Sequence, residues 1–238
     1  MRQLTTYVAL LAMASPFAQA ENFKLEYGSN DWSYDISGSA RSQDGYNDDN
    51  PGGYYFSFEH PVPILPNIRV SRTDMNSSAN EQLTKSAAHG NAAFGLNESA
   101  GNEVKLDQTD VTMYYQLSDS VVDIDLGVNA KYIDSHSRSN SIASGAETAD
   151  VSGWVPMLYA GFDTATPLTG LSISADGSYA AYQDSTFYDY TLKASYITPW
   201  YLGVDVGYRS IRLDLNDFDG SRSGVEFDGP FAGARLDF

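Results

Sequence analysis

The sequence predicts an all-β fold: a closed, antiparallel, up-and-down transmembrane β-barrel of about ten strands. Three observations favour it. Apolar and polar residues alternate over most of the chain after residue 21, a period typical of strands with two different faces. Most alternating segments run about 10–13 residues, which exceeds the ~5–6 of an ordinary strand and suits a tilted crossing of a bilayer. Tyr, Trp and Phe gather near the segment ends, as in the aromatic girdles of membrane barrels.

Composition narrows the class of protein further. The chain has 238 residues, with 31 Asp and Glu against 14 Lys and Arg, and it contains no Cys. The net charge of −17 argues against nucleic acid as a partner, because phosphate binding needs clustered cations. The absence of Cys excludes disulfides, thiol nucleophiles and thiolate metal sites.

Residues 1–20 are predicted to be a secretory signal peptide, which leaves residues 21–238 as a single barrel domain. Arg2 is the only charged residue of this segment, an apolar run follows it, and the small-residue triplet ending at Ala20 fits an A-x-A cleavage site. A short membrane anchor is the alternative, which the length of the run disfavours because a spanning helix needs ~20 residues. We expect export and cleavage after Ala20.

The alternation and the turn residues divide the mature chain into ten strands. Short connections are predicted at 60–66, 118–120, 164–169 and 198–200, and long ones at about 42–52, 76–106, 135–151 and 214–224, with a brief connection at 183–186 on the long side. The strands are expected at roughly 23–41, 53–59, 67–75, 107–117, 121–134, 152–163, 170–182, 187–197, 201–213 and 225–238. Ten satisfies the even count of bacterial barrels and places the short turns in the periplasm.

Some features leave the count open between eight and twelve strands. Residues 28–31 (Gly-Ser-Asn-Asp) could break the first strand in two. Pro156 and Pro230 fall inside predicted strands, where a missing N–H donor would weaken the pairing.

Two architectures explain the alternation. Ile124, Leu126 and Val128 alternate with charged residues such as Asp123 and Asp125, and the apolar faces carry no charge. In a soluble sandwich these apolar faces would point inward, whereas in a membrane barrel they meet lipid and the polar faces line the lumen. Strand length, the aromatic ends and the terminal Phe238 favour the barrel.

The polar faces supply the candidate functional residues. Eleven charged side chains are expected in the lumen: Arg69, Asp123, Asp125, Lys131, Asp176, Asp189, Lys193, Asp205, Arg209, Arg235 and Asp237. Because a ten-stranded barrel is narrow, long side chains fill most of its bore, and we expect ion pairs to plug it. The alternative is a narrow, porin-like channel or a binding cavity in which these charges select the solute.

No catalytic, cofactor or metal site is predicted. The acid-rich segments 44–50 and 214–219 lack the Gly and Glu positions of an EF-hand loop and suit ordinary turns. His60 is expected in a turn and His89 in the longest loop. Asp134 and His136 are two residues apart on one strand and share a face, so a rim-sited surface hydrolase is a further alternative.

Five segments resemble a family of uncharacterised proteobacterial outer-membrane β-barrel proteins. They are Glu59-His60-Pro61-Val62-Pro63-Ile64-Leu65-Pro66-Asn67, Trp154-Val155-Pro156-Met157-Leu158-Tyr159, Tyr188-Asp189-Tyr190, Gly207-Tyr208-Arg209-Ser210 and Phe227-Asp228-Gly229-Pro230-Phe231. The resemblance implies an outer-membrane barrel in a Gram-negative cell and brings no assigned activity. In strand number the chain is also similar to the omptin surface proteases, but no motif matches and no residue is carried over.

The sequence therefore predicts an outer-membrane barrel of structural or interaction type. We expect outer-membrane lipid and lipopolysaccharide as its surroundings, the barrel-assembly machinery as a partner, no nucleic acid, and a monomer. A terminal aromatic residue resembles the signal that this machinery reads, so Phe238 is the predicted assembly signal.

Overall fold

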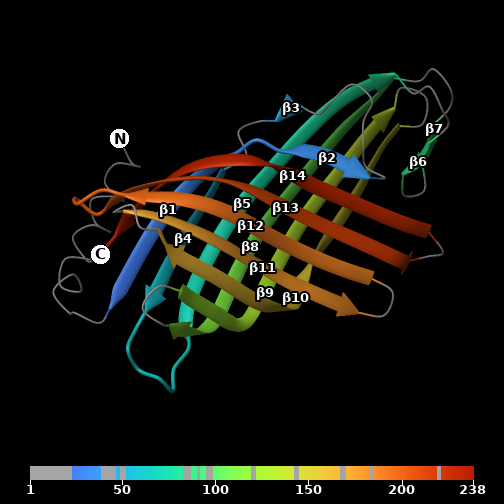
Figure 1. Cartoon of the computed structure of the whole chain (residues 1–238). Coiled ribbons are helices and arrows are strands. Elements are labelled where there is room, and N and C mark those ends of the chain that lie inside the picture. The colour runs from blue at the N-terminus through green and yellow to red at the C-terminus, as the bar shows by residue number, and fades with distance from the viewer. Residues whose placement is uncertain are drawn as a thin grey trace, which may run out of the picture.

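The computed structural model describes residues 23–38, 47–48, 52–82, 87–89, 92–94, 99–118, 122–141, 145–166, 170–182, 185–218 and 221–238, so the predicted signal peptide lies outside the described residues. Ten antiparallel strands close one barrel, which confirms the predicted fold class (Figure 1). They are β1 (Lys24–Trp32), β4 (Gly52–Glu59), β5 (Asn67–Gln82), β8 (Ser99–Ser118), β9 (Val122–Ser141), β10 (Gly145–Ala165), β11 (Leu171–Tyr182), β12 (Ser185–Ile197), β13 (Leu202–Phe218) and β14 (Ser221–Asp237).

Each barrel strand pairs with its neighbour in sequence, and β14 pairs with β1 to close the ring. The closing register runs from Glu26 opposite Asp237 to Trp32 opposite Phe231. The last residue takes part, because Phe238 and Leu25 exchange backbone hydrogen bonds of 2.8 and 2.9 Å. Closure leaves no open sheet edge within the belt that crosses the membrane, as hydrocarbon requires.

The first strand, expected at 23–41, is interrupted at Ser33 and Tyr34, whereas the possible break at 28–31 does not occur. Beyond the break, β2 (Asp35–Gly38) continues along β14. Pro230 lies opposite the break, between the stretch of β14 that pairs with β1 and the stretch that pairs with β2, and its carbonyl accepts the Ser33 N–H at 3.0 Å. A proline without an N–H donor is tolerated there because no ladder bond is required of it.

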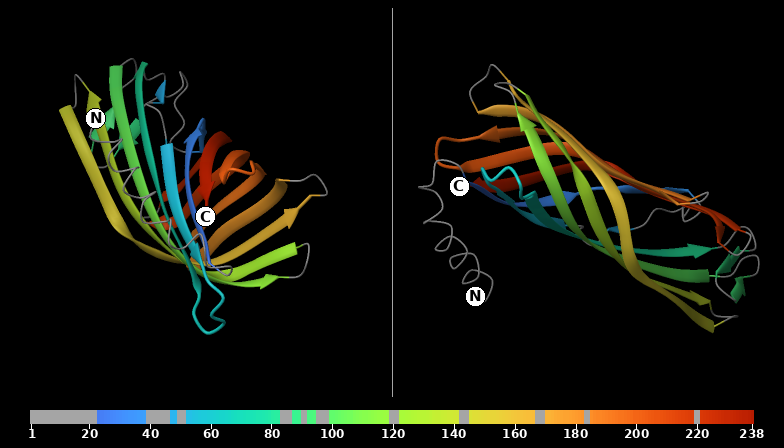
Figure 2. Two further views of the ribbon diagram at one scale, coloured as in Figure 1. Left: turned by 90° about the vertical axis from the view of Figure 1, so that its left-hand side faces the viewer. Right: turned by 90° about the horizontal axis from the view of Figure 1, so that it is seen from below.

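Six strands extend well past their predicted ends, so the predicted long connections are too long. β8, β9 and β10 have 20, 20 and 21 residues, and they rise together with β5 beyond the shorter strands (Figure 2). At ~3.4 Å per residue such a strand spans about 70 Å, whereas a bilayer crossing takes about 9–11 residues. Roughly half of each strand therefore stands outside the membrane belt. We call the end of the barrel where these strands project the long-strand end, and the opposite end the short-turn end.

Three short strands lie inside predicted connections. β3 (Asn47–Asp48) pairs with β5, while β6 (Ala87–His89) and β7 (Ala92–Phe94) form a separate two-stranded sheet. His89 therefore lies in a small hairpin rather than in a plain loop. Pro156 lies in β10 just before the stretch that pairs with β11, which begins at Leu158.

The two faces of the wall are inverted relative to a soluble protein, as the barrel interpretation predicts. Ile124 is 43% exposed and Val204 53% exposed on the outside, although both are apolar. The same outward belt includes Phe56, Ile68, Met113, Leu126, Val128, Leu158, Phe162, Ile173, Leu192 and Val206, with Tyr54, Tyr115, Trp154, Tyr179, Tyr196 and Tyr208 near its margins. Charged and polar side chains are buried on the inside. The soluble sandwich is thereby excluded.

No helix in the part of the chain that the structure describes is both long and apolar enough to span a bilayer.

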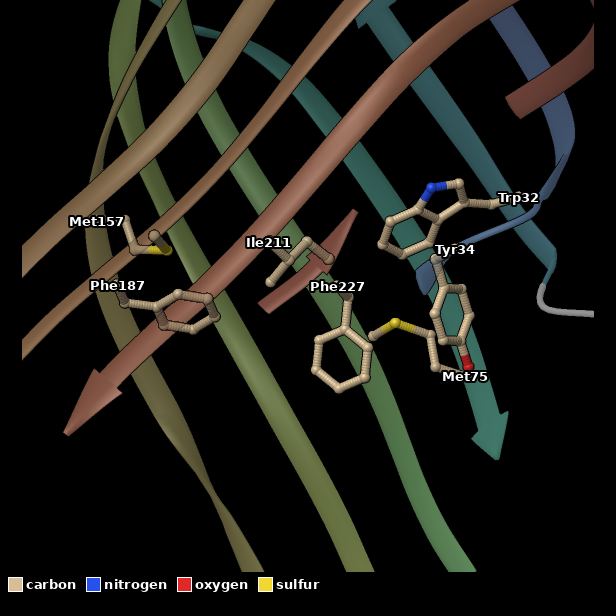
Figure 3. Packing of buried hydrophobic residues seen from close by; sticks show 7 residues of the cluster. All are labelled: Trp32, Tyr34, Met75, Met157, Phe187, Ile211 and Phe227. Atoms are coloured by element: carbon tan, nitrogen blue, oxygen red, sulfur yellow. The ribbon is translucent and has the colours of Figure 1, made fainter. Parts of the chain in front are cut away.

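A cluster of apolar side chains lies inside the barrel, which the sequence interpretation did not foresee (Figure 3). Figure 3 shows these side chains gathered together, and they come from β1, β5, β10, β12, β13 and β14, with Tyr34 just after β1. We call the cluster the apolar plug: Trp32, Tyr34, Met75, Met157, Phe187, Ile211 and Phe227. All seven are at most 6% exposed.

Candidate functional site

A network of buried charges crosses the lumen at mid-height. The Lys131 Nζ of β9 lies 2.8 Å from the carboxylates of Asp110 on β8 and Asp189 on β12, and 3.0 Å from Gln108 Oε1. Its side chain is fully buried. Three directions of its ammonium group are thus matched by three acceptors, which is the full donor capacity of a lysine.

Arg209 of β13 joins the same network. Its Nε and Nη2 donate to both oxygens of Asp189 at 3.0 and 2.8 Å, and its Nη1 donates to Thr73 Oγ1 of β5 at 2.9 Å. The fork-shaped guanidinium fits a carboxylate in this bidentate way, whereas a lysine could not. We call Lys131, Arg209, Asp110, Asp189 and their hydrogen-bonding neighbours the central network. Its two cations and two anions cancel, so the central network itself carries no net charge.

Polar residues of β8, β9 and β11 extend the central network sideways. Asn129 Nδ2 donates to Asp110 Oδ1 at 2.7 Å and to Ser178 Oγ at 3.2 Å, and Thr112 Oγ1 donates to Asn129 Oδ1 at 3.4 Å. The network therefore ties together strands from opposite sides of the barrel.

The apolar plug packs directly against the central network on the side of the long-strand end. The Arg209 guanidinium lies 5.4 Å from the centre of the Trp32 ring, and the Lys131 ammonium lies 5.9 Å from that of Phe187. Trp32 is held in place because its Nε1–H donates to the Gly229 carbonyl at 3.1 Å. The centre of its ring also lies 4.9 Å from the centre of the Tyr34 ring. The break in the first strand brings these two aromatic residues into the plug.

A second group of charges lies nearer the short-turn end. Arg235 lies 3.6 Å from Asp205, 3.5 Å from Asp237 and 3.9 Å from Glu26, and its Nη1 donates to Ser195 Oγ at 3.4 Å. These ion pairs are longer than those of the central network. The Tyr55 hydroxyl donates to Glu26, and Lys193 lies 5.8 Å from the centre of the Tyr55 ring.

Between the two groups is a cavity of about 130 Å³. Arg69, Asp176, Lys193 and Asp205 line it, together with residues of the central network. Arg69 also donates from Nη1 to the Tyr159 hydroxyl at 3.3 Å. Cations and anions share this wall, so the cavity suits water or a small polar solute rather than ions of one sign.

Nine of the eleven predicted lumen residues fall into three groups. Lys131, Asp189 and Arg209 form the central network; Asp205, Arg235 and Asp237 form the second group; and Arg69, Asp176 and Lys193 line the cavity. Asp123 and Asp125 lie on β9 near the short-turn end, and Asp125 Oδ1 is a buried oxygen with no hydrogen-bond partner among the described residues.

The sequence interpretation missed several members of the site. Asp110 and Gln108 lie on β8 at positions that alternate with Val111 and Met113, so this parity could have placed them in the lumen. Glu26 could not be assigned in the same way, because Gly28, Ser29 and Asn30 give the first strand no clear apolar face.

The other candidates lie away from the lumen. Asp134 Oδ1 and His136 Nε2 are 3.4 Å apart and well exposed on the outward face of β9, outside the cavity. Of the acid-rich segments, 44–46, 49–50 and 219 lie outside the described residues, while Asp214 accepts from Arg212 at 2.9 Å and raises the pKa of that guanidinium. In the described ranges, no three His, Asp or Glu side chains are grouped as a metal site.

No protein-family model and no curated protein matches the chain. Among solved structures, the chain is similar to the translocator domain of the autotransporter NalP from Neisseria meningitidis, with 9% identity, a TM-score of 0.49 and coverage of 99% of this chain and 96% of that one. It is similar to the outer membrane protease OmpT from Escherichia coli (10% identity, TM-score 0.47, coverage 92% and 98%) and to Neisserial surface protein A (14%, 0.37, 91% and 97%).

At these identities and TM-scores, the likeness carries no activity from those proteins to this chain. The closed ten-stranded sheet and its outward apolar belt make the chain a transmembrane β-barrel of the outer-membrane type.

Proposed function

We propose that the protein is an outer-membrane scaffold whose lumen is closed to solutes and whose projecting strands are presented for interaction outside the cell. The observation that supports the proposal is that two layers of buried side chains, the central network and the apolar plug, lie inside the barrel. The proposal further includes cleavage of the signal peptide after Ala20, insertion of the barrel by the barrel-assembly machinery, and a monomeric state.

The two layers close the lumen for different physical reasons. The central network is neutral and internally bonded, so a permeating ion would have to displace a partner from a fully buried Lys131. The apolar plug offers no hydrogen bonds to water, and an apolar constriction excludes ions by dewetting. A solute entering the cavity from the short-turn end would therefore meet both barriers in series.

The interaction role rests on the strands beyond the membrane belt. On β9 the outward apolar positions end near Tyr132, and the strand continues to Ser141 with Asp, Ser, His, Arg and Asn residues. β8 and β10 pair with it along this whole stretch. The result is a polar sheet of several strands outside the membrane, larger than a turn needs and suited to contact with other molecules.

Conductance in planar bilayers tests the closed lumen. We expect no current steps from the unmodified protein, and ion current from a variant that opens both layers: Trp32→Ala/Phe187→Ala removes the two rings of the apolar plug that lie against the central network, and Asp189→Ala/Arg209→Ala in the same chain removes one ion pair of that network. Trp154→Ala is the matched control, since it removes a Trp from the outward belt rather than from the plug. Steady, ion-selective current through the unmodified protein would overturn the proposal in favour of the narrow channel.

Epitope tags test the orientation and the presentation of the projecting strands. A tag inserted after Ser141, between β9 and β10, should be recognised by antibody on intact cells. A tag inserted after Ser118, between β8 and β9, should be recognised only after the outer membrane is permeabilised. The reverse pattern would refute the assignment of the long-strand end to the cell exterior.

A further inference from the structure

The connection between β4 and β5 exposes apolar side chains at the short-turn end of the barrel. Ile64 is 84% exposed and Leu65 57% exposed, and Val62 is exposed beside them. We call this connection, His60-Pro61-Val62-Pro63-Ile64-Leu65-Pro66, the Pro-rich turn. It carries no Asp, Glu, Lys or Arg, although the neighbouring strand ends do. A contiguous apolar surface of this kind marks a contact site rather than an ordinary solvent-facing turn.

The Pro-rich turn is held in one conformation by its own hydrogen bonds. His60 Nδ1 accepts the Val62 N–H at 3.2 Å, and the other ring nitrogen lies 3.2 Å from the Pro66 carbonyl oxygen. The neutral tautomer with hydrogen on Nε2 satisfies both contacts. The His60 N–H donates to Asn67 Oδ1 at 3.1 Å, and Leu65 N–H donates to the Val62 carbonyl at 3.3 Å.

Three prolines restrict the same seven residues further, because each fixes its own φ angle and restricts the preceding residue. The apolar tip is therefore preorganised. Little conformational entropy remains to be lost when it binds a partner.

The turn is continuous with the outward belt rather than with the lumen. The Tyr115 hydroxyl donates to the Ile64 carbonyl at 2.9 Å, and Tyr115 lies on the outward face of β8 between Met113 and Leu117, which are exposed to lipid. The His60 ring packs 5.7 Å from the outward-facing Phe58. In Figure 1 this connection, between β4 and β5, extends beyond the strands at that end.

We propose that the Pro-rich turn inserts Val62, Ile64 and Leu65 into the boundary between headgroups and acyl chains of the periplasmic leaflet. Phospholipid is the partner because the exposed side chains are uncharged and the turn adjoins the lipid-facing belt. The hydrogen bond from Tyr115, an aromatic residue typical of the membrane interface, sets the depth of the turn relative to the bilayer. The inserted turn holds the short-turn end at a fixed depth. This inference rests on the membrane placement proposed above.

Spin labels on single cysteines test the insertion, and the chain has no native Cys to interfere. Ile64→Cys is labelled in the full-length barrel, reconstituted in vesicles of phosphatidylethanolamine and phosphatidylglycerol. Power saturation then compares collision with lipid-soluble oxygen and with a water-soluble nickel chelate. Val204→Cys serves as the belt control and the exposed Lys105→Cys as the water control.

We expect the ratio of oxygen to nickel accessibility at position 64 to exceed severalfold that at position 105 and to approach that at position 204. A value at 64 equal to that at 105 would overturn the insertion and would leave the turn free for a periplasmic protein. If position 204 also behaved as water-exposed, the membrane placement itself would fail. The two failures are thus distinguishable.

A second experiment tests whether His60, which acts here as a positioning residue, holds the Pro-rich turn in its conformation through its contacts with Val62 and Pro66. His60→Ala in the Ile64→Cys background removes the acceptor for Val62 and the contact with Pro66. The label at 64 should become more mobile and more accessible to nickel, while a label at 204 in the same background should not change. An unchanged spectrum at 64 would show that His60 does not position the apolar tip.

Discussion

Replacing Asp189 by Asn tests the energetic role of the central network. Asp189 accepts three charge-assisted hydrogen bonds, from Lys131 at 2.8 Å and from Arg209 at 3.0 and 2.8 Å. The Asn side chain has nearly the same shape, so packing is kept while the negative charge is lost. Lys131 and Arg209 would then share the single charge of Asp110 in the lumen.

The size of the effect follows from burial. A hydrogen bond to a charged group contributes about 1.5–3 kcal/mol to stability, but such contributions do not add within one network. Losing one partner of a buried ion pair costs about 3–5 kcal/mol in measured cases. Lys131 is fully buried, and the Asp189 side chain is 11% exposed. We therefore expect Asp189→Asn to lower the free energy of unfolding by about 3–5 kcal/mol.

Urea unfolding of the barrel in lipid vesicles, followed by tryptophan fluorescence and by gel mobility, measures this change. Asp176→Asn makes the same chemical change in the same lumen, where the described residues give Asp176 no ion pair, and it should shift the midpoint little. Equal unfolding midpoints for Asp189→Asn and the unmodified protein would refute the view that the network is a buried, tightly bonded unit.

Three further outcomes are expected. Gly229→Ala should destabilise the barrel by about 1–3 kcal/mol in the same urea assay, because a Cβ there would lie 1.9 Å from the Ser33 carbonyl oxygen. Gly153→Ala is the control and should leave the stability unchanged, because its Cβ would meet nothing within 4 Å. Equal effects of the two substitutions would contradict the steric argument. Phe238→Ala should reduce the amount of folded protein in outer-membrane fractions, whereas an unchanged yield would remove its role as an assembly signal. His136→Ala should leave stability and membrane yield unchanged, since its side chain lies on the exposed outer face; a clear loss of either would show an unrecognised role.

The barrel and its two faces could be predicted because they depend on local alternation. Lipid-facing residues such as Ile124 and Val204 are followed by inward charged residues, Asp125 and Asp205, so a strand reveals both faces without knowledge of its partners. The closing pair β1 and β14 could be predicted only as a consequence of closure. Its register depends on residues more than two hundred positions apart, such as Glu26 and Asp237.

The extended strands could not be predicted because alternation disappears outside the membrane. From Asp134 to Ser141 every residue of β9 is polar, so no apolar position marks either face of the strand. Backbone pairing with β8 and β10 continues there without a hydrophobic pattern to reveal it.

The apolar plug had a weak signal in the sequence. Met157 precedes Leu158, Phe187 precedes Tyr188, and Ile211 falls on the same side of β13 as Arg209. Adjacent apolar residues break the period of two, and in a barrel one of them must point into the lumen. The sequence does not show that these particular side chains contact one another, because the closed barrel brings them together from strands that are distant in the sequence.

A cysteine scan along β9, from Val122 to Tyr132, tests the central claim most directly: the apolar rows face acyl chains and the charged rows face each other. Spin labels on successive positions in reconstituted vesicles report the accessibility of each to lipid-soluble oxygen. The structure predicts a period of two, with Ile124, Leu126 and Val128 freely accessible and Asp125 and Asn129 protected. A profile without alternation, or with high accessibility at Asp125 and Asn129, would contradict it.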